Sequence, residues 1–399
     1  MDKRPLLTGF LSRFSIAYAV VIGALVSSEA YQKRGVSESL YKGLRGSSLL
    51  LGILVGALLL GRYADVSGRK SSLLWSTIIR TLGMIVTVIS PNYPLALLFR
   101  FIAGFGIGGS MASTTSYILE RSHREVRGRN VVFMESMRAR GSTIASVAAI
   151  VTSKANLTRE TTFAISTLFG ILTLIAVYLS PETIVRLARR GDEEAKRLAE
   201  EMGFVISDKT SRVSDLLRSF FSYTILLRIA RAIVGFTYYY RLYTVRSVLS
   251  SLGVSAMSAY KKMGVSLASQ LIGYAYAYLL IDKIGRRPLL VGSFVLGAVS
   301  LPLYFVSPTI AGAAFVAFNV GVRGTIYTYT PELYPTELRA TALGSAVAMA
   351  RAGAILGPMI GYMALSHGLG LRVAILAIVH AAGSIFVYPL PETKGKTIS

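Results

Sequence analysis

A single arginine, Arg351, interrupts an otherwise uncharged run from Ala340 to Leu365 near the end of the chain. A helix rises about 1.5 Å per residue, so Arg351 would lie roughly 16 Å from Ala340. This is close to the centre of a hydrocarbon layer about 30 Å thick. An arginine at that depth is costly unless it faces a polar cavity or a partner. Two interpretations follow, an ion pair with a buried carboxylate or a binding point for a negatively charged solute.

A second group of charges lies in the apolar segment 131–153. Glu135 and Arg138 are three residues apart, so both lie on one face of a helix and can form an ion pair. Alternatively, Glu135 is a protonatable group, and its protonation frees Arg138 to bind an anion. Arg140 lies two residues further on and is a third basic candidate. Glu29, in the first apolar run, is the second candidate for proton coupling.

Aromatic and basic residues elsewhere are deep enough in apolar segments to complete a solute site. Tyr239, Tyr240 and Tyr327 can stack on an organic group or donate hydrogen bonds, with side-chain packing as the alternative. Arg323 lies four residues before Tyr327 and is expected on the same helix face. Arg231 lies nearer the end of its apolar run, and we expect its guanidinium to reach the membrane interface.

The composition predicts that membrane-spanning helices carry these groups. Of 399 residues, 53% are hydrophobic and 16% are charged, against about a quarter charged in soluble domains. The apolar runs have the length of a transmembrane helix and are too long for barrel strands. We therefore expect an all-α membrane protein with twelve transmembrane helices. The predicted spans are 9–30, 46–64, 71–90, 94–119, 131–153, 161–180, 220–245, 259–281, 288–306, 309–330, 340–366 and 370–389.

The remaining composition excludes several classes of site. Cysteine is absent and the three histidines, at 123, 367 and 380, are too widely spaced for a metal site, so no cofactor is expected. No Walker sequence for binding ATP phosphates occurs, and we expect no enzyme activity. The net charge of +23 arises from basic loops between apolar runs, which indicates membrane orientation and not nucleic-acid binding. This pattern predicts a cell-membrane protein with both termini in the cytoplasm. We expect a monomer, although the charge pattern does not determine the oligomeric state.

Charged motifs recur once along the chain. The matched pairs are Asp65 with Asp282, Glu120 with Glu332, Arg127 with Arg339, and Glu182 with Glu392, at offsets of 210 to 217 positions. Such offsets indicate two pseudo-symmetric six-helix bundles, with a substrate site near the midplane between them. We assign residues 1–180 to the N-terminal bundle, 181–219 to a cytoplasmic linker with one surface helix, and 220–399 to the C-terminal bundle.

The repeated motifs have a structural explanation as a cytoplasmic gate. Their glycines allow tight turns, and their aspartates can cap a helix or pair with a neighbouring basic residue. We do not expect these residues to contact a substrate. The predicted gate residues are Asp65, Arg69, Glu120, Arg127, Glu182, Asp282, Arg286, Glu332, Arg339 and Glu392.

At these motifs the chain resembles the major facilitator superfamily. The segments 61–70 and 282–288 look like its signature loops, and 181–183 and 391–395 are similar to marks of its sugar porters. The resemblance implies that the gate pairs hold the outward-open state and break as the two halves rock.

Within the superfamily, the segment 325–344 resembles the organic ion transporters. Their anion-selective members have an arginine in a Met-Ala-Arg-x-Gly sequence of span eleven, which here is 349–353, and cation-selective relatives have an acidic residue there. Tyr239 and Tyr240 fall where the anion transporters have paired tyrosines. Two features depart from that branch, because Tyr274 stands at its basic position in span eight and no large domain separates spans one and two.

These observations predict a secondary transporter that moves a small organic anion, expected to be a carboxylate, by alternating access. The predicted substrate-binding residues are Arg351, Arg138, Arg140, Tyr239, Tyr240, Tyr327 and Arg323. Proton symport, exchange with a counter-transported anion and facilitated diffusion are all open. A proton-coupled sugar transporter is one alternative, although the first span lacks an aspartate. An inorganic anion transporter for phosphate or sulfate is another.

Overall fold

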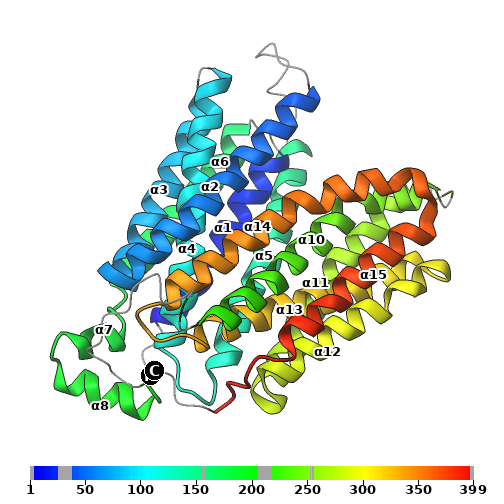
Figure 1. Cartoon of the computed structure of the whole chain (residues 1–399). Coiled ribbons are helices and arrows are strands. Elements are labelled where there is room, and N and C mark those ends of the chain that lie inside the picture. Colours follow the sequence, from blue (N-terminus) through cyan, green and yellow to red (C-terminus); the bar gives the residue numbers. More distant parts are fainter. Residues whose placement is uncertain are drawn as a thin grey trace.

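The structure is a computed structural model that describes residues 4–25, 38–90, 92–154, 159–204, 218, 220–251, 253 and 256–395. Within these ranges, twelve long helices form two groups of six, joined by the short helices α7 and α8 (Figure 1). The first group is α1 (Arg4–Leu25), α2 (Glu38–Ser67), α3 (Arg69–Ile89), α4 (Tyr93–Glu120), α5 (Arg127–Lys154) and α6 (Arg159–Leu179). The second group is α10 (Phe221–Ser251), α11 (Ala256–Ile284), α12 (Arg286–Val299), α13 (Pro308–Glu332), α14 (Arg339–Met363) and α15 (Gly368–Val387). The predicted all-α fold of two six-helix bundles is confirmed.

Local sequence signals set the helix boundaries. The Asn92 side chain accepts a hydrogen bond from the Leu95 amide and caps α4, and Ser307 caps α13 ahead of Pro308. Gly68 and Gly285 have φ angles of 103° and 101° and separate α2 from α3 and α11 from α12. Positive φ favours glycine, so these two positions turn the chain sharply at equivalent places in the two bundles.

The bundles meet at one end and diverge from it. Figure 1 shows α1–α6 and α10–α15 spreading apart from the end that carries α7 and α8, which we call the linker end. Near that end, α2 packs on α14 and α5 packs on α11. At Gly344 there is no room for a Cβ beside the carbonyl oxygen of Ala57. The backbones of α2 and α14 therefore approach closely across the boundary between the bundles.

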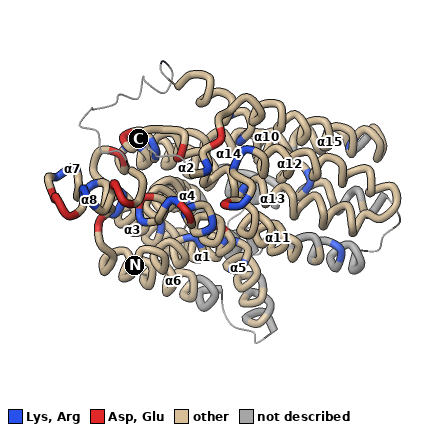
Figure 2. The backbone as a smooth tube through the Cα atoms, turned by 90° about the horizontal axis from the view of Figure 1, so that it is seen from below, with Lys and Arg blue, Asp and Glu red and all other residues tan. Residues whose placement is uncertain are grey.

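Hydropathy identifies seven helices in the described ranges that are long and apolar enough to cross a membrane. The long helices α5 and α10 are not among them, and both carry arginines that lie deep in the structure. The charged residues gather around the linker end, whereas long stretches of α12 and α15 are uncharged (Figure 2). Hydropathy alone does not identify the helices that bring charge into the interior, because α13 and α14 are among the seven and carry the deep arginines Arg323 and Arg351.

The linker differs from the single surface helix that we expected. Two short helices, α7 (Ile184–Arg189) and α8 (Glu193–Glu201), are separated by Gly191, which has a φ angle of 93°. Asp192 then caps α8 by accepting a hydrogen bond from the Ala195 amide. The positive φ breaks the helix at a position that the apolar periodicity alone did not reveal.

Candidate functional site

A small cavity lies between the bundles, where α10, α13 and α14 face α5. Its lining residues are Arg138 from α5; Arg231, Val234, Gly235 and Tyr239 from α10; Arg323 and Tyr327 from α13; and Val347, Ala350 and Arg351 from α14. The volume open to the centre of a water molecule is about 20 Å³ in this cavity. By the same measure, a single bound water needs roughly 10 to 15 Å³. A larger solute therefore requires the lining side chains, or the two bundles, to move.

Arg351 is half-buried at the wall of this cavity. Its Nη1 lies 3.3 Å from the hydroxyl of Tyr239, and its Nη2 lies 3.6 Å from the sulfur of Met111 in the other bundle. Its Nε is buried without a hydrogen-bond partner, and no carboxylate of the described residues forms an ion pair with it. The buried ion pair that we considered for Arg351 is thus not found in this part of the chain.

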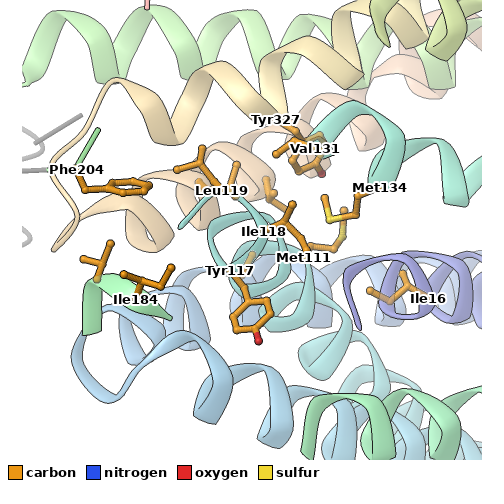
Figure 3. Close-up of a cluster of buried hydrophobic side chains, with 14 of the residues drawn as sticks. Ile16, Met111, Tyr117, Ile118, Leu119, Val131, Met134, Ile184, Phe204 and Tyr327 are labelled. Carbon is orange, nitrogen blue, oxygen red and sulfur yellow. The ribbon is translucent and has the colours of Figure 1, made fainter. Parts of the chain in front are cut away.

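Tyr327 lies between two guanidinium groups that come from different bundles. The Cζ of Arg231 is 3.9 Å from the ring centroid and the Cζ of Arg13, on α1, is 5.1 Å from it. Both distances permit cation–π attraction. Figure 3 shows Tyr327 next to Val131 and near Met134, apolar residues of α5. The tyrosine therefore joins the polar cavity to an apolar cluster shared by the two bundles.

Glu135 pairs with a different arginine from the one expected. Its carboxylate lies 2.8 Å from the Nε of Arg13, and both side chains are fully buried. Arg13 also donates from Nη2 to the carbonyl oxygen of Met111, 2.8 Å away. The helical spacing of Glu135 and Arg138 is as predicted, but the tertiary packing of α1 against α5 supplies a closer partner.

The other predicted residues divide between the cavity and its surroundings. Arg138, Arg323, Tyr239 and Tyr327 line the cavity with Arg351, and the guanidinium of Arg323 lies 4.4 Å from the ring centroid of Tyr238. The structure places two further predicted residues outside the lining: Arg140 is exposed beside Ser136, and Tyr240 is directed towards the backbone of Arg372 on α15. Glu29 falls outside the described residues.

Two buried arginines at the site were not predicted. Arg231 was expected to reach the interface, but it is only 2% exposed and lines the cavity, so that prediction is wrong. Its Nε and Nη2 have no hydrogen-bond partner in the described structure. Two signals were available in the sequence. Arg231, Gly235 and Tyr239 follow a spacing of four that places them on one helix face, and Arg13 is an isolated charge in an apolar run like Arg351.

These contacts give the site a large excess of positive charge. Five guanidinium groups gather around the cavity, those of Arg13, Arg138, Arg231, Arg323 and Arg351. Glu135 is the one carboxylate of the described chain that forms an ion pair with any of them. Charges in a low-dielectric interior interact strongly, so this arrangement attracts anions and repels cations.

The gate residues of the first bundle form a network at the linker end that reaches the second bundle. Asp65 accepts from Nη1 of Arg69 at 2.7 Å and from the amides of Ala340 and Thr341 at 3.1 and 2.7 Å. The carboxylate thereby caps the N-terminus of α14. Arg69 also pairs with Glu120 at 3.0 Å.

The second bundle repeats this arrangement towards the first. Asp282 accepts from Nη1 of Arg286 at 2.8 Å and from the amide of Arg129 at 2.9 Å, in the first turn of α5. Arg286 pairs with Glu332 at 3.0 Å, and Glu332 accepts from the hydroxyl of Thr393 at 2.6 Å. Each aspartate therefore holds the start of a helix in the opposite bundle.

The remaining gate residues close the network. Glu392 accepts from the amides of Arg286 and Arg287, at 3.0 and 2.9 Å, and Glu182 accepts more weakly from that of Lys70, at 3.3 Å. The guanidinium groups of Arg127 and Arg339 lie 4.5 and 5.3 Å from the ring centroid of Phe204, which follows α8. We call the ten predicted gate residues, in this arrangement, the latch.

Comparison with known proteins is consistent with this architecture. The family model described as sugar (and other) transporter matches residues 6–399. The niacin transporter NiaP of Acinetobacter baylyi is 27% identical over 374 residues, covering 87% of this chain and 84% of its own. The putative niacin/nicotinamide transporter NiaP of Bacillus subtilis is 28% identical over 352 residues, with coverages of 86% and 84%.

A solved structure shows the same fold. The proton:xylose symporter XylE matches with a TM-score of 0.83 at 21% identity, over 99% of this chain and 97% of XylE. At that identity the likeness concerns the fold alone. The family match extends over nearly the whole chain and agrees with the two bundles of helices described above. The chain therefore belongs to the sugar (and other) transporter family of the major facilitator superfamily, and it is a multi-pass membrane transporter and not an enzyme.

Proposed function

We propose that this transporter carries a small organic anion with a carboxylate group, of the kind represented by nicotinate. The observation that carries the proposal is the charge balance of the central cavity, where five guanidinium groups surround one paired carboxylate. A neutral sugar requires no such excess of buried positive charge. The relatives named as niacin transporters support the choice, because niacin is an aromatic carboxylic acid that is ionised at neutral pH.

In this proposal Arg351 holds the carboxylate by a charge-assisted, bidentate contact. Its Nε is buried without a partner and its Nη1 has only a long hydrogen bond to Tyr239, so the fork of the guanidinium is available. Arg138 contributes positive charge from the opposite bundle, and the ring of Tyr327 offers a flat surface for an aromatic body. The substrate would thus contact both bundles, as alternating access requires.

The latch supports a mechanism for the conformational change. At the linker end, Asp65 and Asp282 tie the bundles together, while the opposite ends diverge. The Lys and Arg residues of the loops on this side favour a cytoplasmic location for the linker end, with both termini on that side. These observations support our proposal of an outward-facing state of a cell-membrane protein, with 1–180 and 220–399 as the moving halves and 181–219 as the connection. We further propose that the protein acts as a monomer.

Glu135 is our candidate for proton coupling. Its partner is Arg13, so protonation of Glu135 would leave Arg13, and not Arg138, without a counter-charge. Arg13 also lies against Tyr327, which lines the cavity. A proton on Glu135 would therefore raise the positive charge beside the substrate, which makes proton and anion binding mutually favourable. Exchange with an internal anion is the alternative, and it requires no titration of Glu135.

Uptake into proteoliposomes tests the proposal directly. Labelled nicotinate should be accumulated, and unlabelled nicotinate or benzoate should compete. Nicotinamide has the same ring without the charge and should compete at least about tenfold less well, because it cannot form the charge-assisted contact. Competition by glucose or xylose but not by nicotinate would replace the proposal with a sugar transporter. Competition by phosphate or sulfate alone would replace it with an inorganic anion transporter.

A further inference from the structure

A second pocket lies at the linker end, apart from the central cavity. The volume open to the centres of water molecules is about 210 Å³ in this pocket. The walls come from four parts of the chain, which are Asp65 and Arg69 at the α2–α3 turn, Glu120 at the end of α4, the segment around α7, and Thr336 in the loop before α14. The pocket therefore exists only while the two bundles and the linker are held together at this end.

Two buried hydroxyl groups in the pocket wall have no hydrogen-bond partner. Thr183 is 1% exposed and Thr336 is 3% exposed, and the Oγ1 atom of each is unpaired within the described structure. A buried hydroxyl without a partner is costly, and most such groups in proteins are satisfied by protein, water or a ligand. Both residues line the same pocket, so a group bound there would lie next to both side chains.

Positive charge surrounds these hydroxyls. Arg186 and Arg189 of α7 and Arg190, which directly follows the helix, all line the pocket. Arg189 pairs with Glu337, and the Nε of Arg186 approaches the carboxylate of Glu182 only to 3.9 Å. For Arg190, no ion pair is found within the described ranges.

The acidic residues that line the pocket already have partners in the protein. Asp65 and Glu120 both pair with Arg69, and Asp65 also caps α14. Burial lowers the pKa of Arg186; Glu182 opposes this effect, and the nearby Arg190 and Arg69 guanidinium groups reinforce it. Arg186 and Arg190 thus lie in a local excess of positive charge.

We propose that this pocket binds a phosphate group, with the hydroxyls of Thr183 and Thr336 donating to its oxygens and Arg186 and Arg190 supplying the charge. A phosphate has several strong acceptor oxygens and matches guanidinium and hydroxyl donors. The phosphate belongs either to a soluble phosphate ester or to a lipid headgroup. The proposal does not depend on which solute the central cavity transports.

Phosphate binding should favour the latched conformation. Thr336 comes from the second bundle, and Nη2 of Arg69 in the first bundle donates to its carbonyl oxygen at 2.6 Å. Rocking of the bundles would separate Thr336 from Thr183 and Arg186. A ligand that needs all three therefore shifts the population towards the state in which they are close.

Calorimetric titration of the purified full-length protein with inorganic phosphate, at constant ionic strength, tests binding. The double variant Thr183→Val/Thr336→Val should weaken phosphate affinity roughly a hundredfold, at about tenfold or more for each charge-assisted hydrogen bond. Its thermal stability should not fall, because neither hydroxyl has a protein partner. Arg190→Gln should weaken binding several-fold. Thr328→Val and Arg197→Gln are matched controls outside the pocket and should leave the affinity unchanged.

Spin labels test the effect on conformation and the source of the phosphate. The chain has no cysteine, so cysteines at Ile89 and Val306, exposed at the ends of the two bundles opposite the linker end, can be labelled. Inorganic phosphate in detergent, or phosphatidic acid in nanodiscs, should lengthen their separation, and Thr183→Val/Thr336→Val should remove the effect. A response to phosphate identifies a soluble source, and a response only to the lipid identifies a headgroup. No response to either, or an equal response in the double variant, would overturn the proposal.

Discussion

The latch and the central cavity both contain buried arginines, but these arginines differ in how many carboxylates of the protein compensate their charge. In the described latch, three arginines (Arg69, Arg286 and Arg339) form ion pairs with four carboxylates. Asp65 and Asp282 also accept from backbone amides of the opposite bundle. Around the cavity, five arginines share the single carboxylate of Glu135. A buried charge must be compensated by some partner. Where the protein supplies the partner, the charges hold the structure together, and where it does not, we propose that the transported anion supplies it.

The largest effect is expected at Arg351. If its substitution had no effect, the proposed difference between the cavity and the latch would be contradicted. Arg351→Ala should lower nicotinate uptake into proteoliposomes by roughly 30-fold or more, because loss of one partner of a buried charged contact costs at least about 2 kcal/mol. The exposed Arg140→Ala is the matched control, since it removes the same charge outside the cavity lining. Uptake that is unchanged in Arg351→Ala, with the protein correctly folded, would remove Arg351 from the site.

Substitution of Arg231 tests whether anion binding depends on the total positive charge of the cavity or on Arg351 alone. Arg231→Gln removes a guanidinium that has two unpaired nitrogens beside the cavity. We expect nicotinate to compete about tenfold less well, measured by inhibition of labelled uptake, since a desolvated charge at this range contributes about 1 to 2 kcal/mol. If Arg231 acts only by packing on Tyr327, Arg231→Met should retain the normal affinity, and that result would contradict the charge interpretation.

At Glu135 the surroundings of the cavity resemble the latch, because a carboxylate of the protein pairs with a buried arginine, Arg13. Glu135→Gln removes the counter-charge of Arg13, so stimulation of uptake by an inward proton gradient, expected to be several-fold, should disappear while exchange of nicotinate persists. Uptake with and without the gradient measures this. Stimulation that survives the substitution would exclude Glu135 as the proton carrier and favour the exchange alternative.

The smallest effect is expected in the latch, because several contacts together hold the two bundles at the linker end. Asp65→Asn keeps an acceptor oxygen but loses the charge that caps α14, which should destabilise the latched state by about 0.5 to 2 kcal/mol. Spin labels at Ile89 and Val306 should then report a shorter separation. Asp282→Asn should have a weaker effect, because Asp282 accepts one backbone amide of the opposite bundle and Asp65 accepts two. An equal or larger effect of Asp282→Asn would show that the network is not ordered by these caps.

Much of the site was accessible from the sequence because isolated charges in apolar runs have few alternative uses. Arg351 and Arg323 were identified in this way and line the cavity. Arg231 was assigned to the interface because it lies towards one end of the predicted span 220–245, but the packing of α10 against α13 buries it beside Tyr327. Arg140 and Tyr240 share a helix with cavity residues but lie outside the lining, since a shift of one or two positions turns a side chain to another face.

The sequence by itself determined the all-helical fold, the two-fold repeat and the presence of arginines at membrane depth. Each of these follows from local composition and periodicity, which a helix in lipid constrains strongly. The tertiary structure alone decided which charges compensate one another. Glu135 could pair with Arg138 on its own helix, yet the packing of α1 against α5 gives it Arg13. Ion pairing depends on distances of a few ångströms between helices, and those distances are set only when the bundles have packed.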